Sequence, residues 1–140
     1  MDRALKPLRT RRRGDAFVEF AILAPMLVMI LFGVLEMGRV VNAWLVVHNA
    51  AREGARAGVL VYPDSASTTA AQNAAAAYLT AGLSVRGDIS APSAPPNVLV
   101  SSDTVQVTTG ADVQLYTPMF QALLGGSVVH VQATASMRRE

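Results

Sequence analysis

The sequence predicts an α+β protein: a long N-terminal helix (transmembrane, extended outside the membrane), a second Ala-rich helix and a small C-terminal antiparallel sheet. Three observations predict this class. They are an uncharged apolar run, a helical repeat from Val40 onward that contains no proline before Pro63, and alternating valines in the last third. The 140 residues have room for about one domain. We expect a basic head (1–14), a long helix (15–61) and an extracytoplasmic α+β domain (62–140).

The basic head sets the expected orientation. Residues 1–14 hold six basic residues and one acid, a net charge of +5, whereas the remainder is −3. A basic arm can bind nucleic acid, but no aromatic residue is interleaved here and no DNA-binding module follows. Lysine and arginine directly before an apolar helix are instead typical of a cytoplasmic flank. We therefore expect a single-pass protein with a cytoplasmic N-terminus, a C-terminal domain outside, and no nucleic-acid partner.

The apolar run itself extends from Phe20 to Leu35 without a formal charge. At helical rise it covers about 24 Å, and the extension to Gly38 brings it to roughly 28 Å, close to the ~30 Å of a hydrocarbon core. A span over about residues 18–38 follows, with Glu36 and Arg39 able to pair at its far end. The alternatives are a buried helix of a soluble protein and a secretory signal peptide, but no small-residue A-x-A cleavage site follows the run.

The helix is expected to continue from about Phe17 to Val61, with Pro25 as a possible point of bending. A face that starts with bulky Val40, Trp44 and Val47 continues as small residues. The small positions at four-residue spacing are Ala50, Gly54 and Gly58. They suit close helix packing, although an ordinary amphipathic face covering the C-terminal domain explains them equally well.

Beyond Pro63 the pattern predicts a second helix and then strands. Asp64 or Ser65 is a candidate N-cap for a helix over 67–79 that Gly82 closes. After the proline-rich segment 91–96, alternating valines predict short strands around 98–100, 105–107 and 113–115, with a turn at Ser102-Asp103. Gly125-Gly126 opens a last strand, 128–136, in which Val129, Val131, Ala133 and Ala135 share one face.

Nothing in the sequence predicts catalysis. The absence of cysteine excludes disulfides, thiolate metal sites and cysteine nucleophiles. His48 and His130 are the only histidines; they belong to no metal or triad motif, and we interpret them as a helix-surface and a strand residue. Glu53 and Arg56 predict an i,i+3 pair on a solvated helix face. We expect no enzyme activity, no metal and no cofactor.

The first fifty residues carry a family resemblance. The motifs are R-G-x-A-x-V-E-F at Arg13–Phe20, the apolar run with Pro25, Glu36-x-Gly38-Arg39, and N-A-A-R-E-G-A-R at Asn49–Arg56. Together they resemble the N-terminal domain of TadE-like proteins, minor pseudopilins of the Tad or Flp pilus in the type IV pilus superfamily. The C-terminal segment 133–140 also resembles that family, whereas 62–127 matches only in general layout.

The resemblance implies a processing site at Gly14 and Asp15. A prepilin peptidase would remove the leader 1–14 at the bacterial inner (cytoplasmic) membrane, which makes Asp15 the new N-terminus and Glu19 the fifth mature residue. Asp15 departs from the N-methylated phenylalanine of many type IV pilins, so the resemblance does not carry methylation to this chain. A carboxylate beside Glu19 also competes with it for the freed amine.

The same resemblance assigns assembly charge pairing to Glu19, with its neighbour Phe20. In pilins this carboxylate is proposed to meet the N-terminal ammonium of an adjacent subunit. The physics supports such a need, because a charge inside the membrane costs about 2.5–3.5 kcal/mol on insertion scales. The competing explanation is a carboxylate that the helix dipole stabilises by some 0.3–1 kcal/mol, which leaves the spacing from Gly14 unexplained.

Two functions of different classes remain. In the first, the chain is a pseudopilin that takes part in pilus assembly, with roles in adhesion or secretion; its partners are the prepilin peptidase, other pilins or pseudopilins, the inner-membrane assembly platform and the lipid bilayer. In the second, the chain stays uncleaved and is a membrane-anchored binding module of an export or cell-envelope system. The mature N-terminus distinguishes the two.

Overall fold

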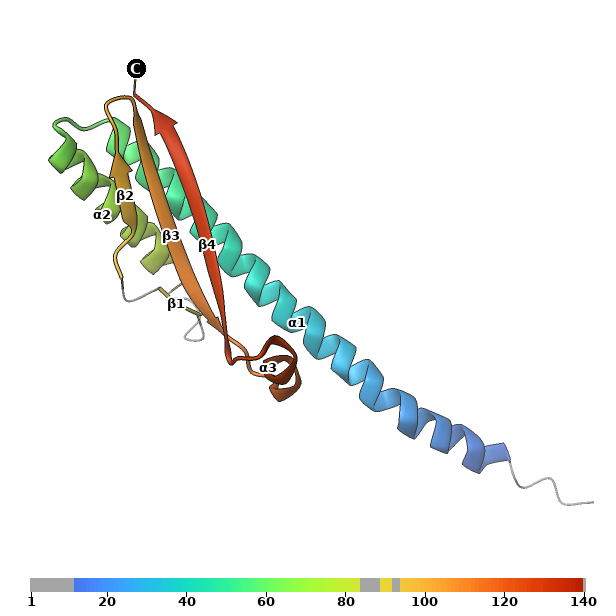
Figure 1. The fold of residues 1–140 in the computed structure, drawn as a ribbon. Coiled ribbons are helices and arrows are strands. Elements are labelled where there is room, and N and C mark those ends of the chain that lie inside the picture. Colours follow the sequence, from blue (N-terminus) through green and yellow to red (C-terminus); the bar gives the residue numbers. More distant parts are fainter. Residues whose placement is uncertain (1–11, 84–88, 92–93, 140) are drawn as a thin grey trace, which may run out of the picture. The chain divides into compact units, whose positions relative to one another are not determined.

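The computed structural model describes residues 12–83, 89–91 and 94–139. It confirms the α+β class (Figure 1). The elements in chain order are α1 (Arg12–Val59), α2 (Asp64–Leu83), β1 (Ile89–Ser90), β2 (Asn97–Val100), β3 (Thr104–Gln114), α3 (Pro118–Leu124) and β4 (Val128–Arg138). The chain divides into two compact units, one up to Leu35 and one from Glu36 onward. Most of the basic head lies outside the described residues.

In the first unit, α1 continues through Pro25. Its side chains are exposed from Gly14 to Leu35 apart from two small residues, Ala24 and Gly33, which are half-buried. Among the described residues, α1 is the one helix long and apolar enough to cross a membrane, and its most apolar stretch is not buried by any other part of the chain. The apolar run is therefore not a core helix buried within the described part of this chain, and its length and composition suit a membrane span.

In the second unit, β3 is the centre of an antiparallel sheet. Along one edge it pairs with β4 over its full length, from Thr104↔Arg138 to Gln114↔Val128. Along the other edge it pairs with β2 and, further on, with the two-residue β1. Every second residue of β3 is buried, as expected for a strand that is covered on one face only.

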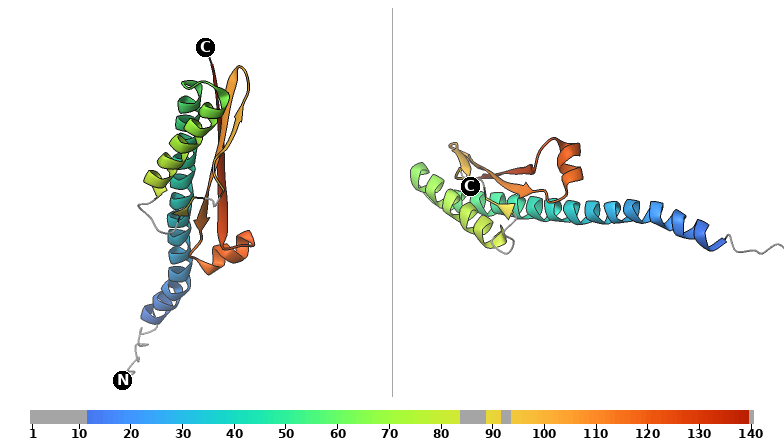
Figure 2. Two further views of the ribbon diagram at one scale, coloured as in Figure 1. Left: turned by 90° about the vertical axis from the view of Figure 1, so that its left-hand side faces the viewer. Right: turned by 90° about the horizontal axis from the view of Figure 1, so that it is seen from below.

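The covered face of this sheet packs against α2 and the second-unit part of α1 (Figure 2). Val47 of α1 and Val105, Val107 and Val113 of β3 are fully buried. Each such side chain contributes about 1.5–3 kcal/mol relative to an exposed one. Thr109, also on the buried face, donates its hydroxyl to the Val47 carbonyl at 3.0 Å. On β4, the predicted shared face is confirmed, with Val131 and Ala133 buried.

Two differences concern α1. It begins at Arg12 rather than near Phe17, because arginine is a good helix former and one glycine costs only about 1 kcal/mol. Of the bulky residues predicted to share a face, Val47 is buried but Trp44 is exposed, and Ala43 beside it is buried instead. Trp44 instead stacks on His48, with ring centroids 5.3 Å apart.

Four further differences lie downstream. α2 starts at Asp64 and extends to Leu83, past the expected stop at Gly82. The two strands predicted around 105–107 and 113–115 form one strand, β3, because pairing with β4 continues across Gly110. Helix α3 was not predicted, although its signals are present: Pro118 occupies the first turn, and Gly125, in the left-handed region at φ 72°, ends the helix. The two-residue β1 was also missed.

Candidate functional site

The residues predicted for processing lie in the first turns of α1. Gly14 is exposed, and a Cβ added there would meet no atom within 4 Å. Asp15 and Glu19 are four residues apart in one helix, so their carboxylates share a face, one turn from each other. Residues 14–20 are all exposed in the described part of the chain.

Glu19 and Phe20 are both exposed at the start of the uncharged run. Glu19 makes no hydrogen bond or ion pair with any residue in the part of the chain that the structure describes. Sixteen residues without a formal charge follow it.

The small residues predicted for helix packing lie in the second unit. Ala50, Gly54 and Gly58 are buried on α1. A Cβ at Gly54 would lie 2.9 Å from the Ala71 carbonyl oxygen, and one at Gly58 would lie 2.8 Å from Val105 Cγ1. Both glycines thus allow α1 to approach α2 and β3 of its own chain.

Glu36, in the second unit, carries a buried carboxylate that bonds to several other residues. It is 6% exposed. Its Oε1 accepts hydrogen bonds from the backbone amides of Tyr116 and Thr117 at 2.8 and 3.0 Å and from the Thr117 hydroxyl at 3.1 Å. Its Oε2 pairs with Arg39 at 2.7 Å, which confirms the predicted i,i+3 pair. All of these bonds satisfy a group that is otherwise costly to bury.

Arg39 extends this cluster in a second direction. Its guanidinium donates to the Gln114 carbonyl at 2.7 Å and lies 4.4 Å from the centre of the Tyr116 ring. The cluster of Glu36, Arg39, Gln114, Tyr116 and Thr117, here called the Glu36 cluster, ties α1 to the segment between β3 and α3. The sequence indicated the Glu36–Arg39 pair, but residues about 80 positions away gave no signal of joining it.

A second predicted pair on α1 is also confirmed. Arg56 donates to both carboxylate oxygens of Glu53, the shorter distance being 2.7 Å. The hydrogen bond from Arg56 lowers the pKa of Glu53 and, reciprocally, raises the pKa of Arg56. Because both side chains are solvent-exposed, this pair contributes little to stability.

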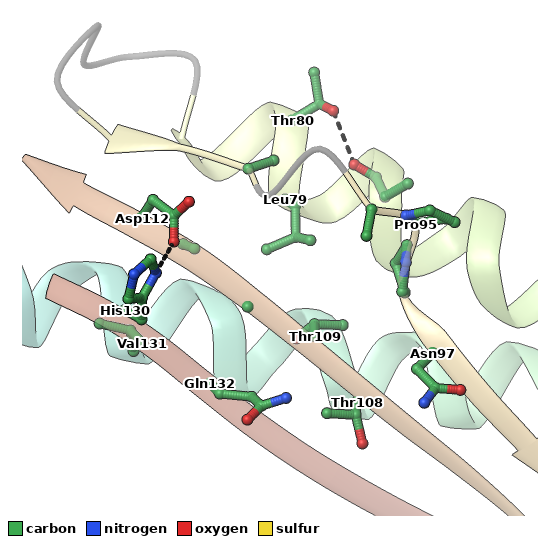
Figure 3. A pocket seen from close by; sticks show the side chains of 16 residues that line it. Leu79, Thr80, Pro95, Asn97, Thr108, Thr109, Asp112, His130, Val131 and Gln132 are labelled. Carbon is green, nitrogen blue, oxygen red and sulfur yellow. Dashed lines mark hydrogen bonds and ion pairs between the residues drawn. The ribbon is translucent and has the colours of Figure 1, made fainter. Parts of the chain in front are cut away.

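A hollow of about 620 Å³ opens between α2, the segment around Pro95 and strands β3 and β4 (Figure 3). Leu79 of α2 and Thr109 of β3 line it, and His130 and Asp112 pair at 2.6 Å at one end. Among the described residues, Asp112 is the hydrogen-bond partner of His130, and no group of three metal-ligating side chains occurs. Such an exposed cross-strand pair lacks the nucleophile and orienting geometry of a triad.

Nearly the whole of α1 resembles a known family. Residues 14–56 match the family model of TadE-like proteins. The match covers slightly less than a third of the chain and confirms the resemblance seen in the motifs. No curated protein and no solved structure matches.

The TadE-like segment starts at the predicted processing residue Gly14 and includes Asp15, Glu19 and Phe20. It also contains Glu36 and Arg39, and it ends before Gly58. TadE-like proteins are a pilus-associated structural family. The strands, α2 and α3 lie outside the TadE-like segment, so their properties rest on the structure of this chain alone.

Proposed function

We propose that this protein is a minor pseudopilin that takes part in Tad or Flp pilus assembly, with a role in adhesion or secretion. The match of residues 14–56 to TadE-like proteins supports involvement in the Tad pilus system. The proposed role as a minor pseudopilin rests on the position of Glu19. Its carboxylate has no partner among the described residues and lies at the start of an exposed, uncharged stretch of helix.

The proposed sequence of events starts at the inner membrane. Basic residues hold the N-terminus on the cytoplasmic side, and a prepilin peptidase cuts after Gly14. The cut frees an ammonium at Asp15 and removes all six basic side chains of the head. The membrane-spanning part of the helix, about residues 18–38, then stays in the bilayer. The rest of the helix and the domain from about residue 62 lie outside.

Assembly then follows from charge pairing. Glu19 of one subunit meets the terminal ammonium of a neighbouring pilin or pseudopilin, and neutralisation offsets the cost of about 2.5–3.5 kcal/mol for an intramembrane charge. The assembly platform and other pilus components are the partners in this scheme. It assigns no residue a catalytic role.

The test is a Glu19→Ala variant in cells that carry the pilus machinery. We expect the variant to insert in the membrane at the wild-type level but to be absent from sheared surface pili, because the partner charge is lost. Asp103→Ala is the matched control, since it removes an exposed acid of the domain whose ion pair is with Arg138. Recovery of the Glu19→Ala protein in pili at the control level would contradict the charge-pairing step.

A further inference from the structure

Helix α3 and the residue before it carry an exposed apolar surface. Tyr116, Leu123 and Leu124 are 64%, 74% and 61% exposed, and Met119 lies beside them one helical turn before Leu123. No residue of α3 is buried. These four side chains are called the α3 patch below. Single exposed apolar residues are normal, but four gathered on one seven-residue helix and its flank call for a partner surface.

The α3 patch lies in a stretch without formal charge. Between Asp112 and His130 the sequence contains no aspartate, glutamate, lysine or arginine. Glu36 and Arg39, the charged residues that contact Thr117 and Tyr116 at the start of this stretch, are paired with each other. A protein surface that faces water usually mixes charges with its apolar residues, so this stretch is better matched to an apolar environment than to solvent.

The Glu36 cluster attaches the residue before α3 to α1 at Glu36. Thr117, the residue before α3, bonds Glu36 through both its amide and its hydroxyl. Glu36 is also the first charged residue after the uncharged run, adjacent in the chain to Leu35. The start of α3 is therefore held at the residue where α1 leaves the apolar run, and α3 itself is only about 10 Å long.

The side chains around this point suit a membrane interface. Tyrosine is enriched where hydrocarbon meets headgroups, and Arg39 lies over the Tyr116 ring with its charge paired. Leucine and methionine on a short helix can enter the acyl boundary by about 5–10 Å. We propose that α3 lies in the interface of the same bilayer that α1 crosses, with Met119, Leu123 and Leu124 toward the acyl chains. This inference rests on the proposed membrane insertion of α1.

Because the chain has no cysteine, single-cysteine variants report one site each. Full-length Leu123→Cys and Leu124→Cys proteins are labelled with an environment-sensitive fluorophore and reconstituted in phospholipid vesicles, then exposed to an acyl-chain-bound quencher or to iodide. Leu99→Cys on β2 is the matched control, because Leu99 is an equally exposed leucine, at 61%. Leu27→Cys in the uncharged run reports insertion of α1.

We expect the labels at positions 123 and 124 to lose emission with the lipid-borne quencher and to be shielded from iodide, as at position 27, whereas the label at position 99 shows the reverse. A water-exposed label at position 27 would mean that α1 does not insert, so the proposed function itself would fail. A lipid-quenched label at position 27 with iodide-quenched labels on α3 would overturn the α3 proposal alone. Labels on α3 shielded from both quenchers would also overturn it, because they would show a protein partner on the patch.

Discussion

At the scale of single residues, Glu36 connects parts of the chain that are far apart in sequence. Its carboxylate receives three hydrogen bonds from residues 116–117 and an ion pair from Arg39. The pair with Arg39 was predictable, because an i,i+3 spacing brings two side chains together in any helix. The bonds to Tyr116 and Thr117 were not, because they depend on how β3 ends beside α1.

Replacing Glu36 by alanine is expected to destabilise the protein by about 3–5 kcal/mol, the usual cost of removing one partner of a buried pair. The loss leaves the amides of residues 116 and 117 without their acceptor and removes the carboxylate partner of Arg39, which keeps its bond to the Gln114 carbonyl. Thermal and denaturant unfolding of the full-length protein in detergent micelles measures the change.

Glu53→Ala is the matched control for this experiment. It also breaks an i,i+3 pair with an arginine on α1, but the pair is exposed, so no measurable change is expected. Equal stabilities of the Glu36→Ala and Glu53→Ala proteins would show that the Glu36 cluster does not hold the second unit together.

At the scale of elements, the sequence predicted the long helix, the alanine-rich helix and the last strand, because each has a repeat that persists over many residues. It failed where two short signals competed. Gly110 and Asp112 indicated a break, yet pairing with β4 carries β3 through both positions. Pro118 follows the predicted strand at 113–115 and fits a strand end as well as a helix start; in the structure it begins α3.

The packing of α1 on α2 makes Gly54 sensitive to a single methyl group. An added Cβ would lie 2.9 Å from both the Ala71 carbonyl oxygen and Ala75 Cβ. Because backbone has to shift to accommodate it, Gly54→Ala is expected to lower the free energy of unfolding by about 1–3 kcal/mol.

Gly38→Ala provides the control, since the same helix offers open space at Gly38. There the better helix propensity of alanine, up to about 1 kcal/mol, is expected to leave stability unchanged or raised. The free energies of unfolding of the two variants are measured in detergent. If Gly54→Ala is as stable as Gly38→Ala, close packing at Gly54 is contradicted.

At the scale of the whole molecule, the functional prediction came from the first unit and the start of the second. Charge asymmetry, the uncharged run and the spacing from Gly14 to Glu19 are properties of the linear sequence, and the TadE-like match covers them. The Glu36 cluster was not predictable, because it forms only when residues 114–117 fold against Glu36 and Arg39 of α1. The α3 patch was missed because helix α3 itself was not predicted. The boundary at residue 61, between the long helix and the extracytoplasmic domain, stays a prediction.

The central claim, that the chain is a processed pseudopilin, also sets the order of events. A subunit can offer its terminal ammonium at Asp15 to Glu19 of a neighbouring subunit only after the peptide bond that follows Gly14 is cut. An uncut chain would carry the same acid with no freed amine nearby, and the alternative of an uncleaved membrane-anchored binding module would apply.

The most direct test is the intact mass of the protein isolated from the membranes of cells that contain the pilus machinery. We expect a chain that starts at Asp15, and a variant at Gly14 that keeps the full-length mass, because the residue before the bond is changed. A wild-type protein that retains its leader from Met1 to Arg13 in these membranes would contradict the account.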